Sequence, residues 1–276
     1  MSSSLNLLSS SGLSPREEKP GGSPGAAAPL ISFRGIHKAF GAKVVLQGVD
    51  LDVYAGETLV VLGRSGSGKT VLTSMLVGLN VPDQGSITVG GKEITKLKSD
   101  KDWRKLRLDT GYLFQGSALY DSMTVGENVA FPMVQHTNWS EEDMARRVHE
   151  KLSQVGLAET EGLEPSELSG GMLRRAALAR SLALDPHLII YDEPTAGLDP
   201  ITCDEIGRLI RHMQKTLKVT SIVVSHDLRL TELVADRCTL IYRGDMVFLG
   251  TFEEFVQSTH PEVRRFLHKD QEENPA

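Results

Sequence analysis

The chain has little cysteine, no long apolar run and no excess of positive charge. Cys203 and Cys238 are the two cysteines among 276 residues, and they show neither metal-ligand spacing nor a disulfide framework. No stretch approaches the roughly 18 consecutive apolar residues that span a bilayer, so we expect no membrane span in the chain itself. The net charge of −6 provides no basic field for nucleic acid, and we expect no nucleic-acid partner.

Residues 1–29 lack the composition of a folded segment. They are rich in Ser, Gly, Pro and Ala, which predicts a disordered N-terminal tail. A secretory signal does not fit, because no basic start precedes an apolar core. A plastid-type transit peptide is an alternative that the serine content favours, whereas Glu17 and Glu18 argue against it.

The order of apolar and amphipathic segments predicts an α/β fold. Strand patterns occupy residues 31–36, 44–53, 58–62, 86–89, 110–114, 188–191, 221–224, 239–242 and 246–249. Helix patterns occupy residues 69–77, 125–131, 141–155, 170–184, 201–217, 228–234, 252–257 and 262–267. Hairpin strands dominate the first third and helices the insert 116–165. The later alternation of buried strands and helices is typical of a parallel sheet covered on both faces.

One glycine-rich run predicts a nucleotide site. It fits G-x-x-x-x-G-K-[ST], the phosphate-binding loop, and consists of Gly63, Arg64, Ser65, Gly66, Ser67, Gly68, Lys69 and Thr70. It follows a strand pattern and begins a helix pattern, so backbone N–H groups and the helix dipole favour an anion there. We expect Lys69 to reach the β- and γ-phosphates of ATP and Thr70 to bind Mg²⁺. We also expect Thr73, in the same helix pattern, to contribute to the ATP site.

A pair of carboxylates follows a later buried strand pattern. The apolar run 188–191 ends in Asp192 and Glu193. A carboxylate at the carboxyl end of a core strand is where a phosphate-loop enzyme holds Mg²⁺, which we expect of Asp192. Glu193 is then placed to polarise an attacking water as the general base.

A second helix start has the features of an anion site. Ser169 is a candidate N-cap, and Gly170 and Gly171 leave the backbone N–H groups bare. With Leu168 before and Met172 after, this run resembles the L-S-G-G-Q signature of the ATP-binding cassette (ABC) family. The resemblance covers about residues 31–257. It implies a cassette domain over 30–257, with a RecA-like, mainly parallel sheet, an N-terminal antiparallel β-subdomain and a helical subdomain at about 116–165. Residues 258–276 are then a short C-terminal extension.

The other family elements occur in the expected order. The resemblance implies that Phe40 stacks on adenine, that Gln115 senses Mg²⁺ and that His226 contacts the γ-phosphate. It also implies a head-to-tail homodimer that encloses two ATP molecules. In that dimer, Ser169, Gly170, Gly171 and Asp199 contact the nucleotide held by the partner subunit.

Details around the motifs are similar to one subfamily. Met172, where most cassettes have Gln, is followed by a double Arg, and this is frequent in the ATPases of Mce-type phospholipid transporters of diderm bacteria. This likeness implies an ATPase on the cytoplasmic face of the bacterial inner membrane, peripheral through a permease. It further implies an Mce-domain substrate-binding partner and phospholipid movement between the inner and outer membranes. Importers of polar amino acids or other small solutes share many of the same residues, so this alternative stays open.

Overall fold

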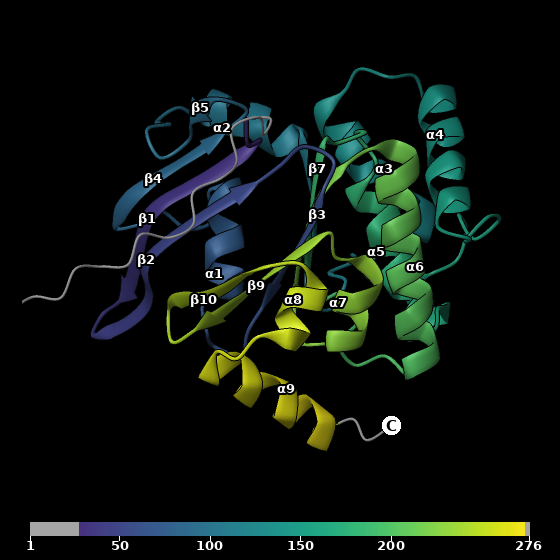
Figure 1. Ribbon diagram of the computed structural model, residues 1–276. Helices are drawn as coiled ribbons and strands as arrows, with labels where there is room; N and C mark the ends of the chain where they lie inside the picture. Colours follow the sequence, from purple (N-terminus) through teal and green to yellow (C-terminus); the bar gives the residue numbers. More distant parts are fainter. Residues whose placement is uncertain (1–27, 274–276) are drawn as a thin grey trace, which may run out of the picture.

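The computed structural model describes residues 28–273 and gives side-chain surroundings as far as His268. Most of the expected disordered tail, residues 1–29, therefore lies outside the described residues. Figure 1 shows two β-sheets, with helix α1 (Lys69–Ser74) between them and a group of helices on the far side of the larger sheet.

The larger sheet has six strands in the order β10-β9-β3-β8-β7-β6. These are β3 (Thr58–Leu62), β6 (Thr110–Leu113), β7 (Leu188–Asp192), β8 (Thr220–Ser225), β9 (Arg237–Tyr242) and β10 (Asp245–Gly250). All pairings are parallel except that of β10 with β9. Every residue of β3, β7 and β8 is buried, which explains the apolar run inside each strand. Because parallel strands end at one edge, the loops after β3, β6, β7 and β8 lie close together.

The smaller sheet is antiparallel and has the order β2-β1-β4-β5. It contains β1 (Ile31–Phe40), β2 (Lys43–Val53), β4 (Gln84–Val89) and the two-residue β5 (Lys92–Glu93). Tight turns at Gly90-Gly91 and Arg243-Gly244 join β4 to β5 and β9 to β10, since Val89 pairs with Lys92 and Tyr242 with Asp245. Positive φ angles at these turn residues explain the glycines.

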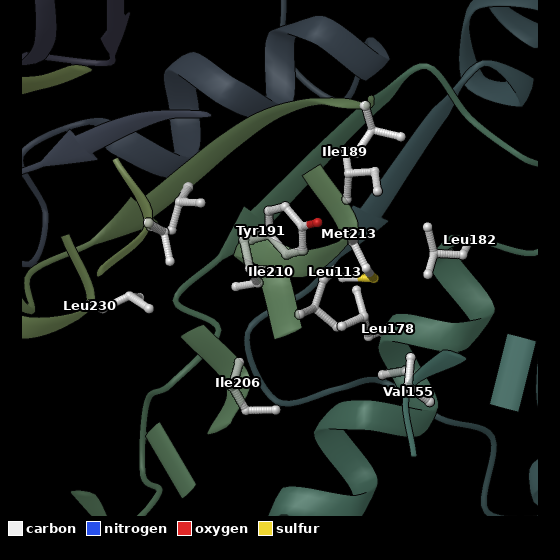
Figure 2. Close-up of a cluster of buried hydrophobic side chains, with 14 of the residues drawn as sticks. Leu113, Val155, Leu178, Leu182, Ile189, Tyr191, Ile206, Ile210, Met213 and Leu230 are labelled. Atoms are coloured by element: carbon white, nitrogen blue, oxygen red, sulfur yellow. The ribbon is translucent and has the colours of Figure 1, made fainter. Parts of the chain in front are cut away.

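Two apolar cores lie on opposite faces of the six-stranded sheet. Alternate residues of β3 divide between them: Leu59 and Val61 pack with α1 and the smaller sheet, whereas Val60 and Leu62 face the other helices. In the second core, α5 (Gly170–Ser181) and α6 (Pro200–Leu217) pack on β7. Figure 2 shows Leu178, Ile206 and Ile210 of these helices gathered near Tyr191 of β7.

The helical insert contains α3 (Val125–His136) and α4 (Glu141–Gln154). Thr124 and Glu127 form a complete capping box at the start of α3. The expected end of this helix at 131 is wrong, because α3 continues through Pro132. Proline removes one backbone donor, and the burial of Val125, Val129 and Met133 against the core holds the helix together.

Helix α2 (Asp100–Leu108) is absent from the helices expected from the sequence, and its residues are mostly charged. Its N-cap is Ser99, and Trp103 packs beneath it against Gly78. The remaining elements are short 3-10 turns at Met75–Val77 and Pro165–Glu167, α7 (Leu228–Val234), α8 (Phe252–Gln257) and α9 (Pro261–Glu273). Helix α9 extends six residues beyond its expected end at 267. Within residues 28–273, no helix has the length and apolar character that a bilayer crossing requires.

Substitution of a buried leucine of α5 tests the described packing of the core. Leu178 is fully buried, and Leu178→Ala is expected to lower the free energy of unfolding by about 2–5 kcal/mol, from lost burial and the cavity left behind. Leu217→Ala is the matched control, because Leu217 is 41% exposed at the end of α6. Urea denaturation of both variants measures the difference. An equal effect of the two substitutions would contradict this description of the core.

Candidate active site

The phosphate-loop sequence lies in the turn between β3 and α1, as expected. Gly68 has a φ of 104°, and a Cβ atom there would come within 2.9 Å of the Val45 carbonyl oxygen. The loop therefore needs glycine at this position, because the backbone of β2 approaches it directly. At Gly66 a Cβ atom would meet nothing within 4 Å, so the loop faces open space on that side.

A hollow of about 360 Å³ lies over the loop. It is lined by Phe40, Lys43, Val45, Gly66, Ser67, Gly68, Lys69, Thr70 and Val71. Phe40, at one side of the hollow, is 49% exposed, so its ring is available for stacking. The Ser67 hydroxyl is buried without a hydrogen-bond partner, so this loop contains a donor that a phosphate oxygen would satisfy.

Lys69 is buried beneath the loop, with 6% of its surface exposed. Its ammonium group donates to the carbonyl oxygens of Gly63 at 2.7 Å and Arg64 at 3.2 Å, and it lies 3.5 Å from a Glu193 carboxylate oxygen. Burial lowers the pKa of Lys69, and the Glu193 charge opposes that shift. The Lys69 ammonium group is thus held by two neutral carbonyl oxygens, and the Glu193 carboxylate balances its charge.

Asp192 lies at the end of β7, where the sequence predicts it. The Thr70 hydroxyl donates to its carboxylate at 3.0 Å, and burial raises the pKa of Asp192. A hydroxyl and a buried carboxylate at this distance are hard oxygen donors of the kind that Mg²⁺ prefers. These two residues fit a magnesium ion bound beside the phosphate loop.

Glu193 and His226 meet at the same edge of the sheet. The His226 Nδ1 atom lies 2.9 Å from Glu193 Oε2, and this hydrogen bond raises the pKa of His226. Glu193 has a φ of +49°, in the left-handed region, and its N–H donates to the Val224 carbonyl of β8. This strained backbone turns the carboxylate between Lys69 and His226.

The signature residues lie on the other face of the sheet. Ser169 caps α5 by accepting from the Met172 N–H at 3.3 Å, and Gly171 packs so tightly that a Cβ atom would lie 2.6 Å from Thr202. Asp199 caps α6 through the N–H groups of Ile201 and Thr202. These three residues therefore have local structural roles, and none belongs to the hydrogen-bonded cluster around Lys69.

Gln115 follows β6 and is exposed. Its position after a parallel strand agrees with the expected site edge, but its side chain is not part of the cluster formed by Lys69, Asp192, Glu193 and His226. Thr73 is buried one turn into α1, and its hydroxyl donates to backbone carbonyls of that helix. The structure thus brings together the phosphate loop, Asp192, Glu193 and His226, and leaves Gln115 and the α5 start separate.

Two residues around the nucleotide hollow were missed by sequence reasoning. Lys43 lines the hollow, and the Lys38 ammonium group lies 5.2 Å from the centre of the Phe40 ring. Both belong to the β1-β2 hairpin that carries Phe40. A basic residue two positions before an exposed aromatic residue and another three positions after it, on the two strands of one hairpin, are the signal that could have found them.

Comparison with known proteins decides the family. The chain matches the family described as ABC transporter over residues 46–196. The chain belongs to the ABC transporter ATPases. A dimeric structure of the cassette MJ0796 bound to ADP and Pi superposes with a TM-score of 0.74 and 28% identity, covering 80% of this chain and 98% of that one. The expected cassette fold and the expected ATPase activity are confirmed, as is ATP binding.

Several curated relatives of this ABC ATPase are similar over most of its length. The "Intermembrane phospholipid transport system ATP-binding protein MlaF" of Haemophilus influenzae is 40% identical, covering 86% of this chain and 90% of that protein. The "Probable ribonucleotide transport ATP-binding protein mkl" of Mycobacterium leprae is 40% identical, covering 86% and 68%. "Protein TRIGALACTOSYLDIACYLGLYCEROL 3, chloroplastic" of Arabidopsis thaliana is also 40% identical, covering 86% and 73%. The resemblance to phospholipid transport ATPases is therefore confirmed at the level of homology.

The Glu193–His226 contact predicts a measurable titration in this ABC ATPase. A raised His226 pKa means that the ion pair stabilises the fold below the unfolded value of about 6.5 and is lost as pH rises through the folded pKa. Glu193→Gln removes the carboxylate and is expected to lower the His226 pKa. NMR titration of the nucleotide-free chain, with His226→Gln to assign the signal, measures it. An unchanged or higher pKa would contradict the contact.

Proposed function

We propose that this chain is the ATP-hydrolysing subunit that powers phospholipid transport between the inner and outer membranes through a partner permease. The observation that carries the proposal is the 40% identity to a phospholipid transport MlaF protein over 90% of that protein's length. A small-solute transporter is the second candidate, because relatives at similar identity are named for ribonucleotide transport.

The geometry supports separate roles for the site residues in nucleotide binding and hydrolysis. Lys69 and the loop N–H groups bind the β- and γ-phosphates, and Phe40 stacks on the adenine. Glu193 accepts the proton of the attacking water, and His226 orients Glu193 and contacts the γ-phosphate. The contacts within the chain support this assignment, because the Lys69 ammonium group lies 3.5 Å from a Glu193 carboxylate oxygen.

Thr70 and Asp192 would hold Mg²⁺, with Gln115 as a third oxygen donor. When bound, the ion neutralises charge on the phosphates and orients them. Thr70 presents its hydroxyl from the first turn of α1, and Asp192 presents its carboxylate from the end of β7. The ends of β3 and β7 are fixed in the sheet, so these two donors are pre-positioned.

A dimer completes the site. ABC ATPases of this family pair, as in the dimeric neighbour bound to ADP and Pi. The α5 start and α1 lie on opposite faces of the sheet within one chain, which supports contribution of Ser169, Gly170, Gly171 and Asp199 to the partner's nucleotide. ATP then lies between the two subunits, and hydrolysis releases them.

Glu193→Gln tests the assigned base. The variant keeps the size and hydrogen-bonding ability of the side chain but cannot accept the water proton, so the hydrolysis rate is expected to fall at least ~100-fold. The ATP-bound dimer is expected to persist. Phosphate release measures the hydrolysis rate, and light scattering in the presence of ATP measures the dimer. Glu253→Gln, at an exposed position of α8, is the matched control. Near wild-type turnover in the Glu193 variant would contradict the assignment.

A groove of about 770 Å³ provides a surface for the permease. It lies between α2, β6, α3 and α5, and its lining includes the aromatic residues Tyr112, Phe114, Tyr120 and Phe131. Its charged lining consists of one acid and four basic residues, Asp100, Arg104, Arg107, His136 and Arg180, and none of these five takes part in an ion pair among the described side chains. An apolar helix with an acidic residue, projecting from the permease, complements this surface.

Recovery of the complex from native membranes tests the partner and the substrate class. We expect a mild-detergent pull-down of the tagged chain to contain a permease, an Mce-domain protein and phospholipid, identified by mass spectrometry. Such a complex is anchored at the cytoplasmic face of the inner membrane through the permease.

Arg104→Glu is expected to reduce permease recovery strongly, because it reverses a groove charge. Lys105→Glu is the matched control, since Lys105 is exposed on the same helix outside the groove. A permease recovered with a solute-binding protein would favour the small-solute transporter. Equal recovery with both variants would contradict the groove as the permease site.

A further inference from the structure

Arg174 occupies an unusual place in the signature helix. It is five residues beyond the N-cap Ser169 and is 5% exposed. Its Nη1 atom donates to the Phe114 carbonyl oxygen at 3.3 Å and its Nη2 atom to the Ala196 carbonyl oxygen at 3.2 Å. Phe114 directly precedes Gln115, and Ala196 begins the segment that leads to Asp199. One guanidinium group therefore joins α5 to the segments before two candidate site residues.

Burying the charge of Arg174 costs desolvation free energy, which a residue with only a packing role would not require. Arg174 belongs to none of the ion pairs among the described side chains, and its Nε atom is buried without a partner. Burial of the unpaired cation lowers the pKa of Arg174. The neighbouring Arg175 differs, because its side chain is 26% exposed and lies 3.7 Å from Glu205. An apolar residue at position 174 would avoid the desolvation cost that Arg174 incurs.

The planar guanidinium group explains what arginine adds at this position. Its two terminal nitrogens are held at a fixed separation by the delocalised plane, and each takes one carbonyl oxygen. Both nitrogen-to-oxygen distances exceed the usual 2.9–3.0 Å, so the guanidinium group lies between the two segments and bonds closely to neither. A lysine ammonium group keeps the charge but lacks this fork.

A second arginine of α5 shows how closely this helix is connected to the loop after β6. Arg180 donates to the carbonyl oxygens of Ala118 at 2.7 Å and Ser117 at 3.0 Å. Ser117 and Ala118 both have positive φ angles, so the loop is held in a strained form. Among the described residues, the hydrogen bonds of the Arg180 side chain go to this loop, whereas Arg174 also donates to the segment after β7.

We propose that Arg174 is a positioning residue for ATP hydrolysis: its guanidinium group sets the separation between the Gln115 segment and the Asp199 segment and ties both to the signature helix. Movement of α5 then shifts Gln115 toward its own nucleotide and Asp199 toward the partner's nucleotide together. The proposal rests on the roles proposed above for Gln115, Asp199 and the dimer.

Kinetics of two Arg174 variants test the proposal. Arg174→Met removes the fork and the charge, and kcat is expected to fall roughly 100-fold, as for a misplaced site group. The KM for ATP is expected to stay within about two-fold, because Arg174 does not contact the phosphate loop. Arg174→Lys keeps the charge and is expected to recover little of the loss. Arg208→Met, at an exposed position of α6, is the matched control.

Folding and dimerisation assays separate positioning from a structural role. Urea denaturation is expected to give Arg174→Met a midpoint equal to or above wild type, since an unpaired buried charge is removed. In the Glu193→Gln background, Arg174→Met is expected to weaken the ATP-dependent dimer at least ten-fold, measured by light scattering over a range of protein concentrations.

Three results would overturn the proposal. They are a kcat within two-fold of wild type for Arg174→Met, full recovery by Arg174→Lys, and a loss of activity matched by loss of folded protein. A different result would overturn the proposed two-subunit function. In that case, wild type and Arg208→Met hydrolyse ATP, but neither Glu193→Gln alone nor Glu193→Gln with Arg208→Met forms an ATP-dependent dimer. The positioning role would then fail as well.

Discussion

The hydrogen bond from Thr70 to Asp192 joins two segments that are 122 residues apart in the chain. It forms because β3 and β7 run in the same direction with β8 between them, so that the phosphate loop and the carboxylate emerge at one sheet edge. Lys69, Glu193 and His226 depend on the same alignment. If one strand shifted by one residue, its side chains would exchange faces, and the cluster would separate together with both cores.

The sheet has a second consequence, because it separates the two helix starts that we propose contact nucleotide phosphates. Helix α1 packs with the smaller sheet, whereas α5 packs with α6 and the helical insert. Helix α5 then serves several purposes at once. Its start carries the signature glycines, its buried side supplies Leu178 to the core, and its arginines hold the loop after β6. The groove proposed for the permease is lined by the same helix, so docking and nucleotide sites share one rigid element.

Much of this architecture could be predicted from particular residues. The apolar runs within β3, β7 and β8 predicted buried parallel strands, and the glycine spacing predicted the loop that follows β3. Helix α2 could not be found in this way, because charged residues outnumber the apolar residues that pack beneath it. The continuation of α3 through Pro132 depends on tertiary packing that no local pattern contains. Strand order and the contacts of Arg174 depend on residues distant in the chain, so they required the structure.

The opposite placement of α1 and α5 makes catalysis a property of encounters between chains. A site assembled from two copies forms at a rate that grows with the square of subunit concentration. Two subunits held on one permease would instead meet at an effective concentration set by the spacing of their docking sites. In the proposed dimer, the permease would therefore control ATP use, because free chains rarely pair at low concentration and chains assembled on the permease pair readily.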